Sequence, residues 1–149
     1  MPFTRFSEAQ HDLVRYAAQN SNRLRNAAEL FMNRLRTSDV LARDVDSWGL
    51  IIDEPIDGVF PIRTPFGTGR AVIHTGVDDM GPQATLVFVR QSLDLRDQKL
   101  WEPVWSLRFT EGGLYAGDDT ENPFKTSEFG LYKTHAEVAL SVLYAFAKV

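Results

Sequence analysis

Residues 85–89 read Thr-Leu-Val-Phe-Val (TLVFV), and this stretch decides the fold. It combines β-branched and aromatic residues over five consecutive positions, which is typical of a β-strand. Because its apolar side chains would point to both faces of a sheet, we expect the strand to be central and to be covered on each side by other structure. The rest of the sheet is then predicted outward from this strand.

Five more runs of strand-forming residues surround this stretch and are separated from one another by Pro, Gly and Asp. With the central strand included, the runs are residues 50–53, 59–63, 70–75, 85–91, 104–110 and 114–116. Such short spacing favours antiparallel pairing of neighbours, so the sequence predicts an antiparallel sheet of about four to six strands. Trp105, Leu107 and Phe109 alternate with polar residues, as in a half-buried strand.

A helical pattern precedes the strands. Ser7 and Gln10 form an SxxQ capping box, which predicts that a helix begins there. Apolar residues then follow at helical spacing on one narrow seam: Leu13, Ala17, Leu24, Ala28, Phe31 and Leu35. The sequence predicts one long helix, in which the poor helix formers at residues 20–22 favour a bend.

Two shorter helical patterns flank the strands. Residues 37–39 offer an N-cap, and the apolar spacing after them predicts a short second helix that ends at Gly49. Thr134 and Glu137 form a TxxE capping box, which predicts that the last helix opens at Thr134. That helix is apolar over most of its surface, so we expect it to pack between the sheet and the N-terminal helix or to form a subunit interface.

Together these patterns predict a single α+β domain over residues 1–149. It consists of a long N-terminal helix, a short second helix, the antiparallel sheet, and an apolar C-terminal helix packed on the sheet. The content of 44% hydrophobic and 24% charged residues is typical of a globular domain. No internal repeat or linker divides the chain.

The composition also excludes several classes of function. The chain has no cysteine, which excludes disulfides, thiolate zinc sites and cysteine nucleophiles. No run reaches the roughly 18 apolar residues of a membrane span, and the first residues carry acids and a histidine where a signal peptide is apolar. We therefore expect a cytoplasmic protein without membrane contact. Because GxSxG and GxGxxG motifs are absent, we assign no catalytic residue, metal site or cofactor.

Charge is distributed unevenly along the chain. Residues 1–43 carry seven arginines and four acids, whereas the remainder carries nine bases and 16 acids, which gives a net charge of −4. A basic helix followed by an acidic body suits charge complementarity within one fold. The arginines could instead bind nucleic acid, but the acidity of the whole chain argues against nucleic acid as a partner.

Two groups of residues are candidate sites. Residues 117–133 form the longest stretch without periodicity and are the candidate functional loop. Its candidate partner-binding residues are Asp118, Asp119, Glu121, Phe124, Phe129 and Tyr132. His74 ends a predicted strand and is followed in a turn by Asp78 and Asp79, so these three residues are an alternative pocket that could orient a base or hold a ligand.

The sequence predicts a non-catalytic protein-binding module of the inhibitor, immunity, adaptor or secretion-chaperone kind. It would act through an acidic surface or through the apolar helix, with another protein as partner. Two alternatives stay open: a small enzyme or ligand-binding domain with a pocket between sheet and helix, and nucleic-acid binding through the arginine-rich N-terminal helix. A homodimer through the C-terminal helix also stays open.

Overall fold

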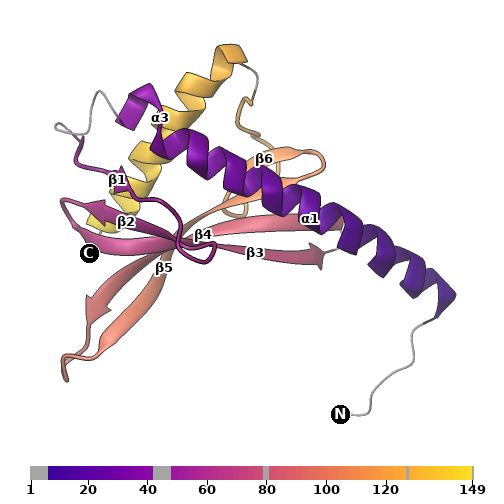
Figure 1. The fold of residues 1–149 in the computed structure, drawn as a ribbon, viewed down its shortest axis with the longest axis horizontal. Helices are drawn as coiled ribbons and strands as arrows, with labels where there is room; N and C mark the ends of the chain where they lie inside the picture. The colour runs from indigo at the N-terminus through magenta and orange to yellow at the C-terminus, as the bar shows by residue number, and fades with distance from the viewer. Residues whose placement is uncertain (1–6, 42–47, 79–80, 127, 149) are drawn as a thin grey trace.

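The computed structural model describes residues 7–41, 48–78, 81–126 and 128–148. Figure 1 shows the helices packed against a curled sheet. In chain order the elements are α1 (Glu8–Arg36), β1 (Ile51–Ile52), β2 (Phe60–Thr64), β3 (Gly67–Asp78), β4 (Gly81–Leu93), β5 (Lys99–Thr110), β6 (Gly113–Ala116) and α3 (Glu128–Ala147). The predicted α+β fold is thus confirmed. Neither helix combines the length and apolar character needed to cross a membrane, as far as the described residues go.

The six strands form one antiparallel sheet in which every strand pairs with the next strand of the chain, in the order β1-β2-β3-β4-β5-β6. Each of the six predicted runs overlaps one strand of the structure, and β3, β4 and β5 extend beyond the predicted residues. β4 holds the predicted central position between β3 and β5. The long β4–β5 hairpin extends away from the rest of the sheet (Figure 1).

Both helices cover the same face of the sheet. Along β4 every second residue is buried on that face: Pro82, Ala84, Leu86 and Phe88. Val87 lies on the other face and is only half-buried, beside its cross-strand neighbours Val72 and Ser106. The expectation that other elements cover β4 on each side is therefore wrong. Neighbouring side chains of the sheet shield the outer valines instead of a second layer of structure.

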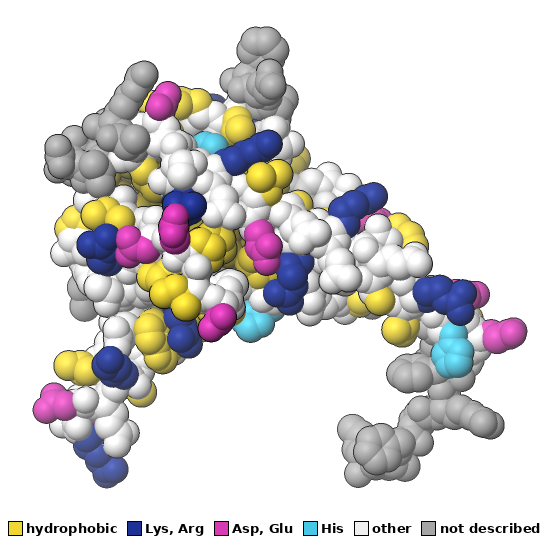
Figure 2. Space-filling view, in the orientation of Figure 1, with side chains coloured by type: hydrophobic (Ala, Val, Ile, Leu, Met, Phe, Trp, Pro, Cys, Tyr) yellow, Lys and Arg dark blue, Asp and Glu magenta, His cyan; other side chains and the backbone are white. Residues whose placement is uncertain are grey.

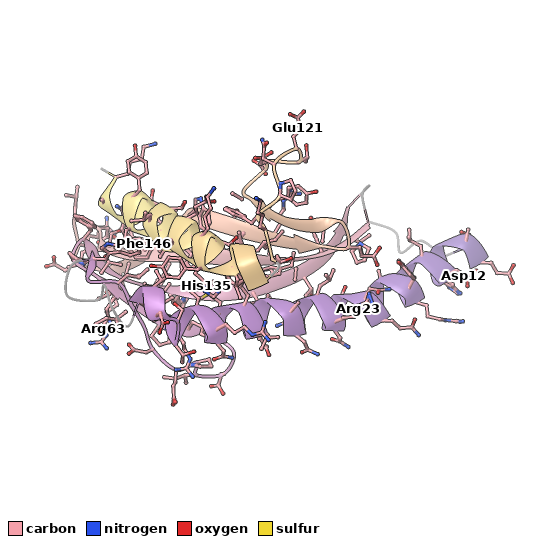
Figure 3. All side chains as sticks on the ribbon, turned by 90° about the horizontal axis from the view of Figure 1, so that it is seen from above. Asp12, Arg23, Arg63, Glu121, His135 and Phe146 are labelled. Carbon is pink, nitrogen blue, oxygen red and sulfur yellow. The ribbon has the colours of Figure 1, made fainter. Side chains whose placement is uncertain are left out.

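α1 is one continuous helix of 29 residues, as predicted, and it bends along its length (Figure 3). Five residues of the predicted seam are buried, but Leu13 is 54% exposed because the first turns of α1 extend past the sheet (Figure 1). Tyr16 at this end donates a hydrogen bond from its hydroxyl to Glu111 Oε1 at 2.6 Å. That hydrogen bond raises the pKa of Tyr16 above its usual value.

The region of the predicted short second helix is described only in part. Residues 39–41 and residue 48 are helical, whereas residues 42–47 lie outside the described part of the chain. Gly49 follows, where the sequence predicts the helix end, with a φ of +70°. A Cβ at this position would approach Pro65 Cγ to 2.6 Å, so both the backbone conformation and the packing require glycine.

α3 begins at Glu128, six residues before the predicted start at Thr134. Thr134 is buried within the helix and donates its hydroxyl to the carbonyl of Lys125, so it holds the preceding loop and does not cap the helix. Glu137 instead forms an i,i+4 ion pair of 3.8 Å with a lysine one turn earlier. Glycine is a poor helix former, so Gly130 weakens the helical pattern of this segment. A Cβ at this position would lie only 2.6 Å from Lys125 Cβ, so the packing here requires glycine.

The core lies where α1 and α3 meet over the sheet. Phe31 of α1 packs edge-on against Phe109 of β5 at 5.7 Å and against His135 of α3 at 5.4 Å between ring centroids. One aromatic side chain therefore joins both helices to the sheet.

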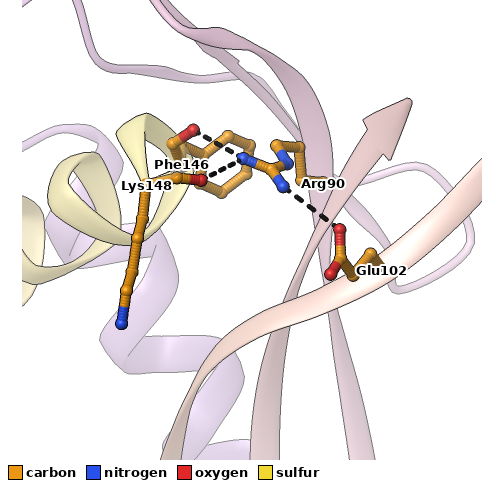
Figure 4. Close-up of polar contacts among 4 residues, drawn as sticks. All are labelled: Arg90, Glu102, Phe146 and Lys148. Atoms are coloured by element: carbon orange, nitrogen blue, oxygen red, sulfur yellow. Dashed lines mark hydrogen bonds and ion pairs between the residues drawn. The ribbon is translucent and has the colours of Figure 1, made fainter. Parts of the chain in front are cut away.

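Arg90 fastens the C-terminal end of α3 to β4 (Figure 4). Its Nη1 donates to the backbone carbonyls of Phe146 at 3.0 Å and Lys148 at 2.8 Å, and its Nη2 pairs with Glu102 at 3.1 Å. The last carbonyls of a helix lack partners within the helix, so a guanidinium in this place satisfies them and fixes the position of α3.

Protonation of His135 is expected to destabilise the fold. His135 is 5% exposed, and no described residue hydrogen-bonds its Nε2. Burial, and to a lesser degree the positive charge of Arg34, lower the pKa of this imidazole below 6.5. Between the lowered pKa and 6.5 the unfolded chain binds the proton more readily, so the free energy of unfolding is largest above about pH 6.5 and falls as the pH drops below it.

Urea unfolding at several pH values between about 8 and 5 measures this dependence. His135→Phe keeps a ring against Phe31 without an ionisable nitrogen, and we expect it to lose less stability than the wild type over this range. His74→Gln, which changes an exposed histidine, is the control. We expect its free energy of unfolding to depend on pH as in the wild type. Equal dependence in all three proteins would show that His135 does not cause the effect.

Candidate functional site

A groove of about 720 Å³ lies between α3 and β5. Val104 and Trp105 of β5 line one side, and Leu140 and Tyr144 of α3 line the other. Leu140 is 49% exposed and Tyr144 is 71% exposed. These two residues are four positions apart on a helix and therefore lie one turn apart on the same face. Two opposing apolar walls thus remain open to solvent.

Polar side chains line the same groove. Arg90, Glu102 and Lys148 contribute charges, and Ser141 contributes a hydroxyl that donates to the Glu137 carbonyl at 2.7 Å. Arg90 and Glu102 already pair with each other, which holds their side chains in place (Figure 4). The groove therefore combines an apolar centre with ordered charged groups, an arrangement common in binding sites.

The side of β5 next to the groove lacks a neighbouring strand over part of its length. β6 pairs with β5 only along residues 107–110, so residues 99–105 pair with β4 on one side and have no strand on the other side in the described part of the chain. Trp105 packs inward on Phe88, with ring centroids 5.6 Å apart. Trp101 lies on the opposite face of the sheet, where the Arg70 guanidinium stacks over its ring at 4.0 Å. The two tryptophans therefore do not share a surface.

In the predicted functional loop, Asp119 has a structural role. Its carboxylate accepts hydrogen bonds from the N–H groups of Glu121 at 2.9 Å and Asn122 at 3.2 Å. These contacts, the one from Glu121 first, hold the pKa of Asp119 below its usual value. Arg108 donates to the Gly117 and Asp119 carbonyls at 2.7 and 2.6 Å. The loop is thus tied to the outer face of the sheet.

The other residues predicted in this loop divide into two groups. Phe124 is half-buried, packs on the core and bridges to Leu114, to whose carbonyl its N–H donates at 2.8 Å. Asp118, Glu121 and Tyr132 are exposed, and Figure 3 shows Glu121 at the tip of the loop. Phe129 belongs to α3, and its side chain lies outside the described part of the structure.

A second hollow, of about 310 Å³, lies between this loop and the start of α3. Asp119 and Phe124 line it from the loop, and Lys133, Thr134 and Glu137 line it from the helix. Because Asp119 and Phe124 already hold the loop in place, their substitution would disturb the structure as well as any binding. Asp118 and Glu121 are therefore the better residues with which to test this loop.

The alternative pocket of His74, Asp78 and Asp79 does not coincide with the groove. His74 is exposed on β3 opposite Thr85, on the face of the sheet that the helices leave uncovered. Asp78 is the last residue of β3, its side chain is outside the described part, and Asp79 lies outside the described residues altogether. Among the described residues no three His, Asp or Glu side chains are arranged to hold a metal ion.

The arginines of α1 do not form one continuous stripe. At 100° per residue, Arg23 and Arg34 lie on one flank of the buried seam, whereas Arg25 and Arg36 lie on the opposite flank. Arg15 points away from the seam. Figure 3 shows Arg23 on the exposed side of α1. The positive charges are therefore spread around the helix and not gathered on one nucleic-acid-facing side.

Sequence reasoning missed the residues of the groove. Arg90, Val104 and Tyr144 come from separate elements, and no spacing in the sequence relates them. One available signal was the position of Leu140 and Tyr144, which share a helical stripe with the polar Glu137. Comparison with protein-family models, with curated proteins and with solved structures finds no match to this chain.

Proposed function

We propose that the protein is a non-catalytic binding module and that another protein places an apolar segment in the groove between α3 and β5. Leu140 and Tyr144 carry this proposal, because they stay exposed on a helix that buries Val138, Val142 and Phe146 in the core. Contiguous apolar side chains that stay exposed in a groove, as these do, are a common feature of protein-interaction surfaces.

The charged groups around the groove support the same function. Protein-binding sites commonly have an apolar centre and a polar rim, and Arg90, Glu102 and Lys148 supply that rim here. An inhibitor, immunity, adaptor or secretion-chaperone role fits a site of this kind, and we place the interaction in the cytoplasm. The acidic loop is the second candidate surface for the same partner.

Site-specific photocrosslinking distinguishes the two surfaces. Benzoylphenylalanine replaces Tyr144 in the groove or Tyr132 near the acidic loop, both of which are exposed aromatic positions on α3. We expect irradiation in cells to crosslink a specific protein from position 144 and not from position 132. Crosslinking from position 132 alone would move the binding site to the loop, and Asp118→Lys with Glu121→Lys would then be the variant to test.

A matched pair of substitutions tests the importance of the apolar wall. Leu140→Asp places a charge in the groove, whereas Leu30→Asp places one on α1, at a leucine of similar exposure, 50% against 49%. We expect the partner to be lost by the first variant and retained by the second. Since burying an unpaired carboxylate is costly, affinity should fall at least tenfold. Equal affinity of both variants would exclude the groove.

A small-molecule ligand is a second candidate occupant, because 720 Å³ lies within the range of ligand pockets. Native mass spectrometry of the protein from its own source separates these possibilities. A bound second protein supports the binding module, whereas a retained small molecule supports the ligand-binding alternative. A homodimer through α3 would cover the same groove and would be lost in Leu140→Asp.

A further inference from the structure

Besides the outer sides of the short terminal strands β1 and β6, two longer stretches of strand edge are unpaired among the described residues. β2 pairs with β3 only from Gly67 to Ala71, which leaves residues 72–78 of β3 open on that side. At the opposite edge, residues 99–105 of β5 are open beyond the end of β6. An open edge presents unpaired backbone N–H and C=O groups, to which another strand can bind.

These two edges differ in their protection against pairing. The β5 edge carries Lys99, Glu102 and Pro103, and charged residues and proline are the usual means by which sheet edges discourage further strands. The β3 edge reads Val-Ile-His-Thr-Gly-Val-Asp over residues 72–78, and its one charged residue, Asp78, stands at the end of the strand. Residues 74–77 are exposed. The β3 edge is therefore the less protected one.

Alternation along β3 identifies the residues whose backbone groups face the open side. A two-residue turn joins β2 to β3, with Thr64 opposite Gly67. Residues that flank such a turn exchange backbone hydrogen bonds, so the odd-numbered residues of β3 face β2. Beyond the end of β2 the same alternation directs the N–H and C=O groups of Ile73, Thr75 and Val77 toward solvent.

We propose that a second copy of this chain binds at this edge, with the two β3 strands antiparallel about a two-fold axis at Thr75. In this register Thr75 lies opposite the same residue of the second copy, Ile73 lies opposite Val77, and His74 lies opposite Gly76. Each of the outward-facing residues then exchanges backbone hydrogen bonds with its counterpart. The resulting dimer has one continuous sheet.

The side chains favour a second copy over an unrelated strand. A two-fold interface must be complementary to itself, and the Thr75 register places no like charges opposite one another, because Asp78 lies opposite Val72. The Thr75 register joins apolar to apolar residues and threonine to threonine, and Gly76 leaves room for the imidazole of His74. A register centred on His74 would place the two imidazoles opposite each other and would leave Val77 without a counterpart.

Additional surface is available beside the β3 edge. Pairing of so short an edge alone falls below the roughly 1,200 Å² of a standard stable interface. Figure 2 shows the molecule hollowed beneath the sheet, between the β4–β5 hairpin and the N-terminal end of α1. α1 and the hairpin each carry exposed apolar residues, Leu13 and Val14 on α1 and Leu93 and Leu95 at the end of the hairpin. These side chains are further apolar surface for a second copy to cover.

This interface lies away from the groove between α3 and β5, so it is independent of the proposed function.

Thr75→Pro in the full chain is the test variant, because it removes an N–H from the open side of β3 and leaves the pairing with β4 intact. Thr75→Val keeps the N–H and is the matched control. Sedimentation velocity between about 1 and 100 µM covers the range of ordinary dimer affinities. We expect the wild type and Thr75→Val to sediment as dimers, with twice the chain mass of 16.9 kDa, and we expect Thr75→Pro to sediment as a monomer.

A second variant and a second measurement guard against misfolding of Thr75→Pro. Val77→Lys changes a side chain that is 48% exposed and places charge against the second copy's Ile73, so it should also be monomeric. Hydrogen exchange should show protected amides at Ile73, Thr75 and Val77 in the wild type and exchanging amides in Val77→Lys. A wild type that is monomeric throughout, or a dimer that survives Val77→Lys, would overturn the proposal, as would a dimer lost only in Leu140→Asp.

Discussion

Phe88→Ala is expected to lower the free energy of unfolding by about 3–5 kcal/mol. Phe88 is fully buried at the centre of β4, under both helices, and its ring packs against Trp105. Truncation removes the apolar transfer energy of the ring and leaves a cavity that the surrounding strands cannot fill by collapsing. Urea unfolding followed by far-ultraviolet circular dichroism measures the change without depending on the neighbouring tryptophan.

Phe66→Ala is the control for this substitution. Phe66 is 55% exposed in the turn between β2 and β3, so its removal should change stability by no more than about 0.5 kcal/mol. A loss of comparable size in both variants would mean that Phe88 is not the centre of the core.

Gly69→Ala is expected to cost at least about 2–3 kcal/mol, although it adds only one methyl group. A Cβ at this position would lie 2.1 Å from the Val89 carbonyl oxygen and 2.7 Å from the Phe146 ring. The carbonyl belongs to the neighbouring strand and the ring is buried under α3, so neither can move aside cheaply. The substitution should therefore push α3 away from the sheet and loosen its C-terminal end.

Gly76→Ala in the same strand is the matched control when both glycine variants are made in the Val77→Lys chain, which removes the proposed contact at β3, because a Cβ at Gly76 meets no atom of its own chain within 4 Å. Alanine in place of a strand glycine reduces the entropy of the unfolded chain, so we expect this variant to be neutral or slightly more stable than the wild type. Thermal unfolding of both variants gives the comparison. Similar melting temperatures would show that β3 and Phe146 are not packed as closely as these distances require.

Local patterns were sufficient to predict most of the architecture. The six strand runs, the N-terminal helix and its single seam each depend on periodicity within one segment, and the structure confirms the strands, the helix and five of the six seam residues. The central position of β4 also followed from its apolar composition. These features are encoded locally, so a single sequence carries them.

The errors arose where tertiary contacts outweigh local pattern. The TxxE pattern led to a predicted start of α3 at Thr134, because the sequence does not show that the Thr134 hydroxyl binds the Lys125 carbonyl from within the helix. Val87 and Val89 suggested a second covering layer, whereas the curled sheet shields them partly by itself. Leu13 follows the seam of α1 but extends past the sheet that would bury it.

Prediction of the candidate site needed information that the linear sequence lacks. The groove joins residues near position 104 to residues near position 144, and only the packing of α3 on the sheet brings them together. Of the predicted irregular stretch 117–133, residues 117–126 are irregular, whereas residues 128–133 belong to α3. Its acidic residues looked alike in the sequence, but the structure separates Asp119, which binds the loop backbone, from the exposed Asp118 and Glu121.

The pairing of each strand with its neighbour also has a consequence for the order of assembly. Short turns close these hairpins, and such local closures are fast compared with contacts between distant segments. The bond from Arg90 to the Phe146 carbonyl spans 56 positions, and α3 follows all six strands in the chain. During synthesis the sheet can therefore form while its apolar face still lacks α3. We expect this intermediate to be the species most prone to aggregate, and the docking of α3 to end that exposure.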